Sequence, residues 1–64
     1  MKTLTVRELE VAELVTEGLS NQEIASRLFI SVHTVKSILE NIFDKIDIHN
    51  RVQLAVYYCQ NNNS

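Results

Sequence analysis

The stretch SNQEIASRLFISVHTVK, residues 20–36, limits the possible folds more than any other feature of this chain, because it holds two helix starts with almost nothing between them. Ser20 and Ser31 can each accept a hydrogen bond from a backbone N–H in the first turn of a helix. Only residues 29–31 separate the helices expected at 21–28 and 32–46. A connection this short predicts a steep crossing between the two helices.

Further capping patterns complete a set of four helix starts. TVRE at residues 5–8 and SNQE at 20–23 have the spacing of a capping box, and NRVQ at 50–53 is a third box-like start. Gly18, the single Gly of the chain, stands where a left-handed residue would end the first helix. With no Pro and no strand pattern, the sequence predicts one all-α, four-helix domain over residues 1–64, with helices at about 6–17, 21–28, 32–46 and 51–60.

Length and composition are those of a small globular domain. With 64 residues, 45% of them apolar and 22% charged, the chain can bury only a modest core. No apolar run approaches the ~20 residues that a membrane-spanning helix needs, and the N-terminus has no signal-peptide pattern. Cys59 is the single Cys and cannot form an internal disulfide. We therefore expect a cytoplasmic domain with no membrane association, in a reducing compartment.

The net charge of −2 argues mildly against a nucleic-acid partner, because proteins that bind nucleic acid usually have a basic surface. The acidity is concentrated at the start of the chain. Residues 1–19 carry two cations against four Glu residues, a balance of −2, whereas residues 20–64 carry four cations against four acidic residues, a balance of zero. The segment with the two adjacent helix starts therefore has no excess of acidic residues.

The helix expected at 32–46 has one apolar face and one polar face. The apolar face consists of Val35, Ile38, Leu39, Ile42, Phe43 and Ile46. The polar face consists of His33, Lys36, Ser37, Glu40, Asn41 and Asp44. An amphipathic helix occurs in any small bundle, so this pattern alone specifies no partner. Together with the short connection before it, the pattern indicates a helix-turn-helix unit, whose second helix enters the DNA major groove.

Several short motifs occur together in the order and spacing of a known family. They are LTxRExEV at 4–11, EGLSNxEIA at 17–25, LxxSxxTVK at 28–36, IxxKI at 42–46 and Arg51. On these motifs, residues 4–58 closely resemble the LuxR-type helix-turn-helix domain, also called the FixJ or GerE type. The resemblance implies a four-helix, double-stranded-DNA-binding output domain of a transcription regulator. It also implies that a receiver or sensor domain often precedes it in a longer chain, and that its last helix often forms a homodimer.

The resemblance also implies roles for individual positions. Positions facing base edges are matched by Ser37 and Glu40. Positions that touch phosphates or nearby base edges are matched by Thr34, Lys36 and Lys45. Val35 matches a position at the core boundary that can also touch DNA. Asn21, Gln22 and Arg51 lie at or near helix N-termini that are expected to approach the DNA backbone. The unpaired N–H groups of a helix N-terminus attract phosphate even where no Lys or Arg is present. The complete predicted DNA-binding set is Asn21, Gln22, Ser31, His33, Thr34, Val35, Lys36, Ser37, Glu40, Lys45 and Arg51.

Three departures from the family pattern bear on DNA affinity. Ile38 stands where the family often has His, and Gln22 where it often has Lys, which removes one cation. Glu40 and Asp44 lie on the polar face at positions where Ser, Lys or Arg is more usual. Phosphate repels a carboxylate, but Glu can accept a hydrogen bond from cytosine N4 in the major groove. Glu40 therefore either reads a cytosine or weakens DNA binding.

The helix expected at 51–60 is apolar over a wider arc than one core contact needs. Leu54, Ala55 and Tyr58 lie on one strip, and an adjoining strip is formed by Val52, Val56 and Cys59. The second strip predicts a dimer interface, unless both strips are buried in so small a protein. The acidic residues leave an alternative function open. In that alternative, the same fold is a protein-interaction module that pairs with another regulator and modulates it.

No other chemistry is visible in the sequence. His33, His49 and Cys59 lie on different segments without metal-ligand spacing, and no Gly-rich loop could hold a nucleotide. No arrangement of nucleophile, base and orienting residue is apparent. We therefore expect no enzyme activity, no metal and no cofactor.

Overall fold

The computed structural model describes residues 3–62, with side chains described as far as residue 60, and within that range it contains four helices and no strand. These helices are α1 (Val6–Thr16), α2 (Asn21–Leu28), α3 (Val32–Ile46) and α4 (Arg51–Asn62). The predicted all-α, four-helix fold is confirmed. Two bounds differ from the expected ones, since α1 ends one residue earlier and α4 continues two residues further.

The first two helices begin with reciprocal capping boxes. At α1 the Glu8 N–H donates to Thr5 Oγ1 at 3.2 Å, and the Thr5 N–H donates to the Glu8 carboxylate at 2.8 Å. Ser20 and Glu23 repeat both bonds at α2, with the same distances of 3.2 and 2.8 Å. Each box satisfies two backbone donors at a helix start, which explains why these helices begin at these residues.

The start of α4 is a variant of the same device. The Gln53 N–H donates to Asn50 Oδ1 at 2.9 Å, as an N-cap requires. The Gln53 side chain, however, accepts a hydrogen bond from the His49 N–H at 2.7 Å, one residue before the cap. The box-like pattern seen in the sequence therefore does cap α4, with its second bond displaced by one position.

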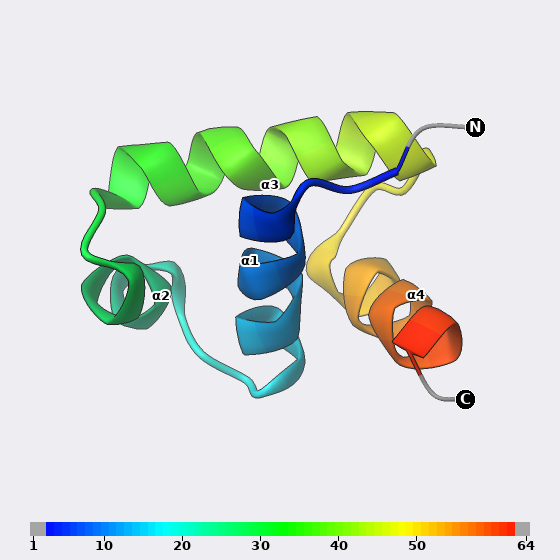
Figure 1. Cartoon of the computed structure of the whole chain (residues 1–64), viewed down its shortest axis with the longest axis horizontal. Coiled ribbons are helices and arrows are strands. Elements are labelled where there is room, and N and C mark those ends of the chain that lie inside the picture. The colour runs from blue at the N-terminus through cyan, green and yellow to red at the C-terminus, as the bar shows by residue number, and fades with distance from the viewer. Residues whose placement is uncertain (1–2, 63–64) are drawn as a thin grey trace.

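Three helices end in the same left-handed turn, although only one of the three residues that turn the chain is Gly. Gly18, Phe29 and Asp47 have φ values of 85°, 60° and 55°. In each turn the following N–H bonds back to the carbonyl five residues earlier, as in a Schellman motif. These bonds join Leu19 to Leu14 at 3.3 Å, Ile30 to Ala25 at 3.0 Å and Ile48 to Phe43 at 3.1 Å. The turn at Phe29 changes the direction of the chain between α2 and α3, which cross steeply (Figure 1).

The core lies where the four helices meet. α1 packs against each of the other three helices, and α2 also packs against α3. The buried apolar side chains come from all four helices, namely Val11, Ala12, Leu14, Val15, Ile24, Ala25, Val35, Leu39, Ile42 and Leu54. Ile30, in the connection between α2 and α3, packs against this core and holds the turn in place.

The arrangement leaves one side of α3 uncovered. α3 lies along one edge of the molecule, with α1 below it and α2 and α4 on either side of α1 (Figure 1). The apolar side of α3 faces the other three helices, and no described helix covers its opposite side. Within residues 3–62, no helix has the length and apolar character that crossing a bilayer requires.

Candidate nucleic-acid interface

The uncovered side of α3 carries five of the eleven predicted DNA-binding residues. His33, Thr34, Lys36 and Glu40 are exposed, and Ser37 is half-buried beside them. The fold therefore presents these side chains together on one face of a single 15-residue helix. A protruding helix of this kind has the width that the major groove of duplex DNA admits.

The start of α3 is capped as well as exposed. The Thr34 N–H donates to Ser31 Oγ at 3.0 Å, which caps the helix, and the two hydroxyls lie 2.9 Å apart in a second hydrogen bond. Both residues are exposed. The helix N-terminus carries a partial positive charge and backbone N–H groups without intrahelical partners, which together favour an anion such as phosphate.

A groove runs beside α3, where the starts of α2 and α4 approach it. It has a volume of about 300 Å³ and is lined by Asn21, Lys36, Leu39, Glu40, Phe43 and Arg51. Two cationic side chains from different helices therefore meet one groove, with an acidic side chain on the same rim. Leu39 and Phe43 were not among the predicted site residues. Their spacing of three and seven residues from Lys36 was the signal that could have placed them on this flank of the helix.

Arg51 connects the start of α4 to the start of α2. Its guanidinium donates to Asn21 Oδ1 at 2.5 Å and to the Leu19 carbonyl at 2.8 Å. Arginine has five N–H donors, so these two bonds leave donors for another acceptor at the groove. The sequence predicts that Arg51 and Asn21 contact the DNA backbone, but it does not predict the hydrogen bond between the two side chains. Gln22, next to Asn21, is exposed.

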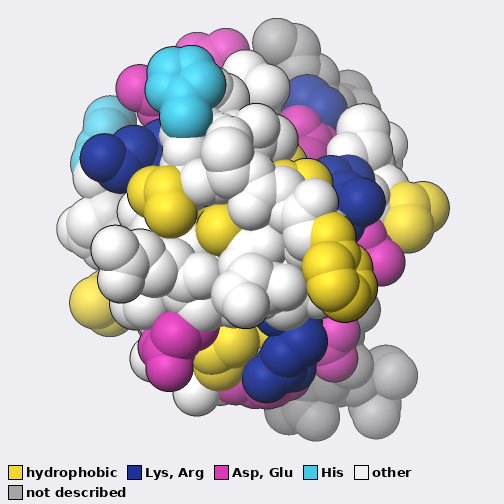
Figure 2. Space-filling view, turned by 90° about the vertical axis from the view of Figure 1, so that its left-hand side faces the viewer, with side chains coloured by type: hydrophobic (Ala, Val, Ile, Leu, Met, Phe, Trp, Pro, Cys, Tyr) yellow, Lys and Arg dark blue, Asp and Glu magenta, His cyan; other side chains and the backbone are white. Residues whose placement is uncertain are grey.

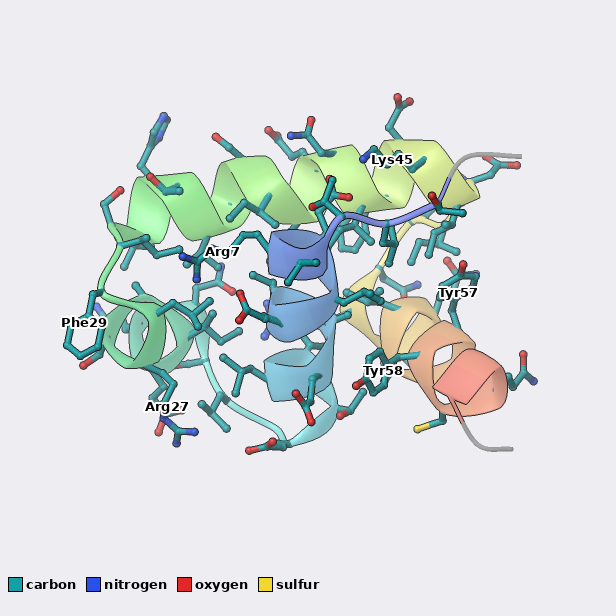
Figure 3. All side chains as sticks on the ribbon, in the orientation of Figure 1. Arg7, Arg27, Phe29, Lys45, Tyr57 and Tyr58 are labelled. Atoms are coloured by element: carbon teal, nitrogen blue, oxygen red, sulfur yellow. The ribbon has the colours of Figure 1, made fainter. Side chains whose placement is uncertain are left out.

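Lys45 differs from its predicted role. Its ammonium lies 2.7 Å from the Glu8 carboxylate, and the Lys45 side chain is only 27% exposed (Figure 3). The prediction of a phosphate contact did not include this ion pair, which joins the end of α3 to the start of α1. Lys45 therefore neutralises a carboxylate of its own chain before it can contribute charge to a phosphate.

The Lys45 ion pair changes the acidity of Glu8. Burial of the Glu8 carboxyl by itself raises its pKa. The hydrogen bond and charge of Lys45, with two hydrogen bonds from Thr5, outweigh burial and lower the pKa of Glu8 below its ordinary value. The carboxylate therefore remains charged in the folded protein at neutral pH.

Val35 requires a correction. The resemblance places it at the core boundary with access to DNA, but its exposed fraction is 0%. The side chain packs in the core between α3 and the other helices. The predicted DNA contact of Val35 is wrong, because a fully buried side chain has no surface to offer a duplex.

The predicted dimer strip on α4 is accessible. Val52 is 73% exposed and Val56 is 49% exposed, and Cys59 is also exposed. Leu54, on the other strip of the helix, is fully buried. The idea that both strips lie in the core is therefore wrong.

Phe29 is the most exposed large apolar residue among those described, at 95%. It turns the chain between α2 and α3 and points outward beyond both helices (Figure 3). Sequence reasoning treated it only as part of the connection. Its aromatic type gave no sign that it would lie outside the core, since Phe is usually buried.

Charge on the end of the molecule that carries α2 and the start of α3 is mixed. Lys and Arg side chains lie singly among Asp and Glu on this face and form no continuous basic patch (Figure 2). Among the described residues, no group of three or more His, Cys, Asp or Glu side chains is arranged to hold a metal ion. This end of the molecule therefore offers a binding partner the starts of α2 and α3 and a few separate cationic side chains.

Comparison with known proteins identifies bacterial regulators that are similar to this chain in sequence. The sequence matches the family described as bacterial regulatory proteins, luxR family, over residues 2–58. It is 47% identical over 60 residues to the transcriptional regulatory protein LiaR of Bacillus subtilis. It is 44% identical over 59 residues to the response regulator protein VraR of Staphylococcus aureus. The alignments cover 94% and 92% of this chain but only 28% of each of these curated relatives.

A solved structure has the same fold. The crystal structure of the response regulator ChrA, from a heme-sensing two-component system, has a TM-score of 0.86 and 33% identity to this chain. The similarity covers 98% of this chain and 31% of that one. The family match extends from the segment before α1 into α4. A helix-turn-helix domain of this family serves DNA-binding transcription regulation and is not an enzyme. The chain therefore belongs to the luxR family of bacterial regulatory proteins.

Proposed function

We propose that this domain binds double-stranded DNA by inserting the uncovered face of α3 into the major groove. The observation that carries the proposal is the joint exposure of His33, Thr34, Lys36 and Glu40 on the one side of α3 that no described helix covers. In helix-turn-helix proteins the N-terminal residues of the second helix contact base edges. The first three of these residues lie within five positions of the start of α3.

Contacts to the DNA backbone come from the groove beside α3 and from helix starts. Lys36 and Arg51 supply charge there, while Asn21 and Gln22 stand at the start of α2. Ser31 caps the start of α3 by accepting a hydrogen bond from the Thr34 N–H, and both residues are exposed to solvent. This arrangement offers an explanation of how a chain with a net charge of −2 can approach phosphate, because helix N-termini attract anions without basic side chains.

Affinity is expected to depend on pairing two domains. With two or three phosphate contacts per domain, the logarithm of the binding constant should fall with the logarithm of salt at a slope of roughly −2 to −3. One domain alone therefore binds weakly. Two domains associated through Val52, Val56 and Cys59 of α4 would bind half-sites about one helical turn, roughly 34 Å, apart. In this proposal the domain serves as the output end of a longer regulator that includes a receiver or sensor domain.

A fluorescence titration of labelled duplex DNA at two salt concentrations, about 50 and 200 mM, tests this function. Salt-sensitive binding is the expected result. Lys36→Ala should weaken binding on every sequence and make the salt slope shallower by about 1. Arg27→Ala is the matched control, because Arg27 is also exposed but points away from α3 (Figure 3). Equal losses for the two variants would contradict the proposed orientation.

A second candidate function is supported by the exposed strip on α4. Val52 and Val56 could pair this domain with another regulator and modulate it without a DNA contact. The same titration separates the two functions. No binding to duplex at low salt, together with tight association with a related regulator, would favour the second.

A further inference from the structure

We propose that Glu40 is a specificity-determining residue that accepts a hydrogen bond from cytosine N4, so that each half-site requires a C·G pair at one position. This inference rests on the proposed DNA-binding function and adds the identity of a base. Its starting point is an exposed carboxylate in the middle of the face that would enter the groove.

Glu40 is placed where a side chain can reach the next bases after those near Lys36. The two residues are four positions apart on α3, about 6 Å along the helix axis, and they line the same groove. Along a recognition helix, residues three or four positions apart contact successive bases, so the two side chains address neighbouring base positions. Lys36 also brings a positive charge one turn from the carboxylate, which reduces its repulsion by the DNA backbone.

The Glu40 carboxylate has no structural role that would account for it. The ion pairs within the described residues join Arg7 to Glu10 and Lys45 to Glu8, and neither involves Glu40. No side-chain hydrogen bond among those of residues 3–60 includes it either. The carboxylate is therefore available to an external donor.

The chemistry of a carboxylate selects the base. An ionised carboxylate only accepts hydrogen bonds, and the donors in the major groove are cytosine N4 and adenine N6. Adenine places its N7 acceptor beside N6, where it would repel the second carboxylate oxygen. Guanine and thymine present acceptors at the corresponding positions. Cytosine has no acceptor beside N4 on its own groove edge, and the nearest acceptor is O6 of the paired guanine. Cytosine is therefore the base that Glu40 favours.

Selection of binding sites from a pool of random duplexes at low salt tests this assignment. The 64-residue chain is compared with three variants, Glu40→Ala, Glu40→Gln and Asp44→Ala, after circular dichroism has established that each is folded. Asp44 is the matched control, since it is an exposed carboxylate one turn further along the same helix. The selected sequences are then made as single duplexes and titrated individually.

The wild-type chain should select cytosine at one position of each half-site. Glu40→Ala should lose that preference, with discrimination against the other bases falling by about 5- to 150-fold at that position only. Glu40→Gln should select adenine there, because Gln can donate to N7 and accept from N6 of adenine. Asp44→Ala should keep the wild-type base preferences.

The opposite result is equally clear. If Glu40→Ala and the wild-type chain select the same bases, and the variant binds every duplex more tightly by a similar factor, Glu40 only weakens DNA binding and the inference fails while the proposed function stands. If the wild-type chain binds no duplex at low salt, the proposed function fails and the inference falls with it.

Discussion

The Glu8 carboxylate acts at two places that are far apart in the sequence. It accepts a hydrogen bond from the Thr5 N–H at 2.8 Å, which caps α1, and one from the Lys45 ammonium at 2.7 Å. Glu8 is 6% exposed, so the interaction is partly shielded from water. Removing one partner of such a pair leaves a poorly solvated charge, which is usually more costly than the loss of an exposed ion pair.

Glu8→Gln should lower stability at neutral pH by about 1–3 kcal/mol, because it removes the charged partner of Lys45. The pH dependence has a definite sign. The folded pKa of Glu8 lies below its ordinary value of 4.5, so its stabilisation is complete above that pH and is lost as the pH falls through the folded pKa. The difference in Tm between the wild-type chain and Glu8→Gln should therefore shrink below pH 4.5.

Thermal denaturation followed by circular dichroism from about pH 7 to pH 3 measures this difference. Lys45→Met is a useful companion variant, because it removes the hydrogen bond and charge of Lys45, which lower the pKa of Glu8, and leaves burial opposed by the Thr5 hydrogen bonds alone. The pKa of Glu8 should therefore be higher in this variant than in the wild-type chain. Parallel Tm curves for the wild-type chain and Glu8→Gln over the whole range would contradict the coupling of Glu8 to Lys45.

At the scale of the helix, the ends of α1 and α2 each depend on a residue in the left-handed backbone conformation. Gly18 adopts φ of 85° at the end of α1, and Phe29 adopts φ of 60° at the end of α2. A Cβ added at Gly18 would meet no heavy atom within 4 Å outside its chain neighbours, so the cost of Ala there comes from the backbone conformation. Phe29 is 95% exposed, so its removal sacrifices almost no burial.

These two positions should respond in opposite directions. Gly18→Ala should destabilise the domain by about 1 kcal/mol, because a Cβ disfavours the left-handed conformation. Phe29→Gly should stabilise the isolated domain by about 1 kcal/mol for the same reason. Urea denaturation of both variants against the wild-type chain measures the free energies of unfolding. A loss of stability in Phe29→Gly would mean that Phe29 contacts something in solution, such as a second copy.

At the scale of the whole molecule, α4 has one side for the core and one for solvent. Leu54 is fully buried, whereas Val52 and Val56 are 73% and 49% exposed on the other strip. Val56→Asp should therefore reduce self-association, since a charge would be buried at the proposed interface. Sedimentation velocity and binding to paired half-sites both report this loss, while binding to a single half-site should be unchanged.

Val6→Asp is the matched control for that experiment. Val6 is 76% exposed, and it lies at the start of α1, outside the proposed interface. The control should sediment like the wild-type chain. If Val56→Asp also sediments and binds paired half-sites like the wild-type chain, the proposed dimer through α4 is wrong.

Much of the fold was predictable because it depends on interactions between close neighbours in the sequence. The capping boxes at Thr5 and Ser20 join residues three positions apart, and both formed as predicted. The end of α2 had no such signal, since Phe29 is not a residue that a left-handed turn usually selects. The end of α3 had only a weak one, because Asp, as at Asp47, adopts this conformation more often than most residues but less readily than Gly. The exposure of the polar face of α3 was predictable from the helical spacing of its apolar and polar residues.

The sequence by itself determined where the helices begin, which face of α3 is polar and which family the chain resembles, because these properties depend on residue types at short, regular spacings. Only the tertiary structure decided which polar groups stay available for a partner. Lys45 meets Glu8 across 37 positions, and Arg51 meets Asn21 across 30. Such contacts depend on how the helices pack against one another, and no local pattern records that packing.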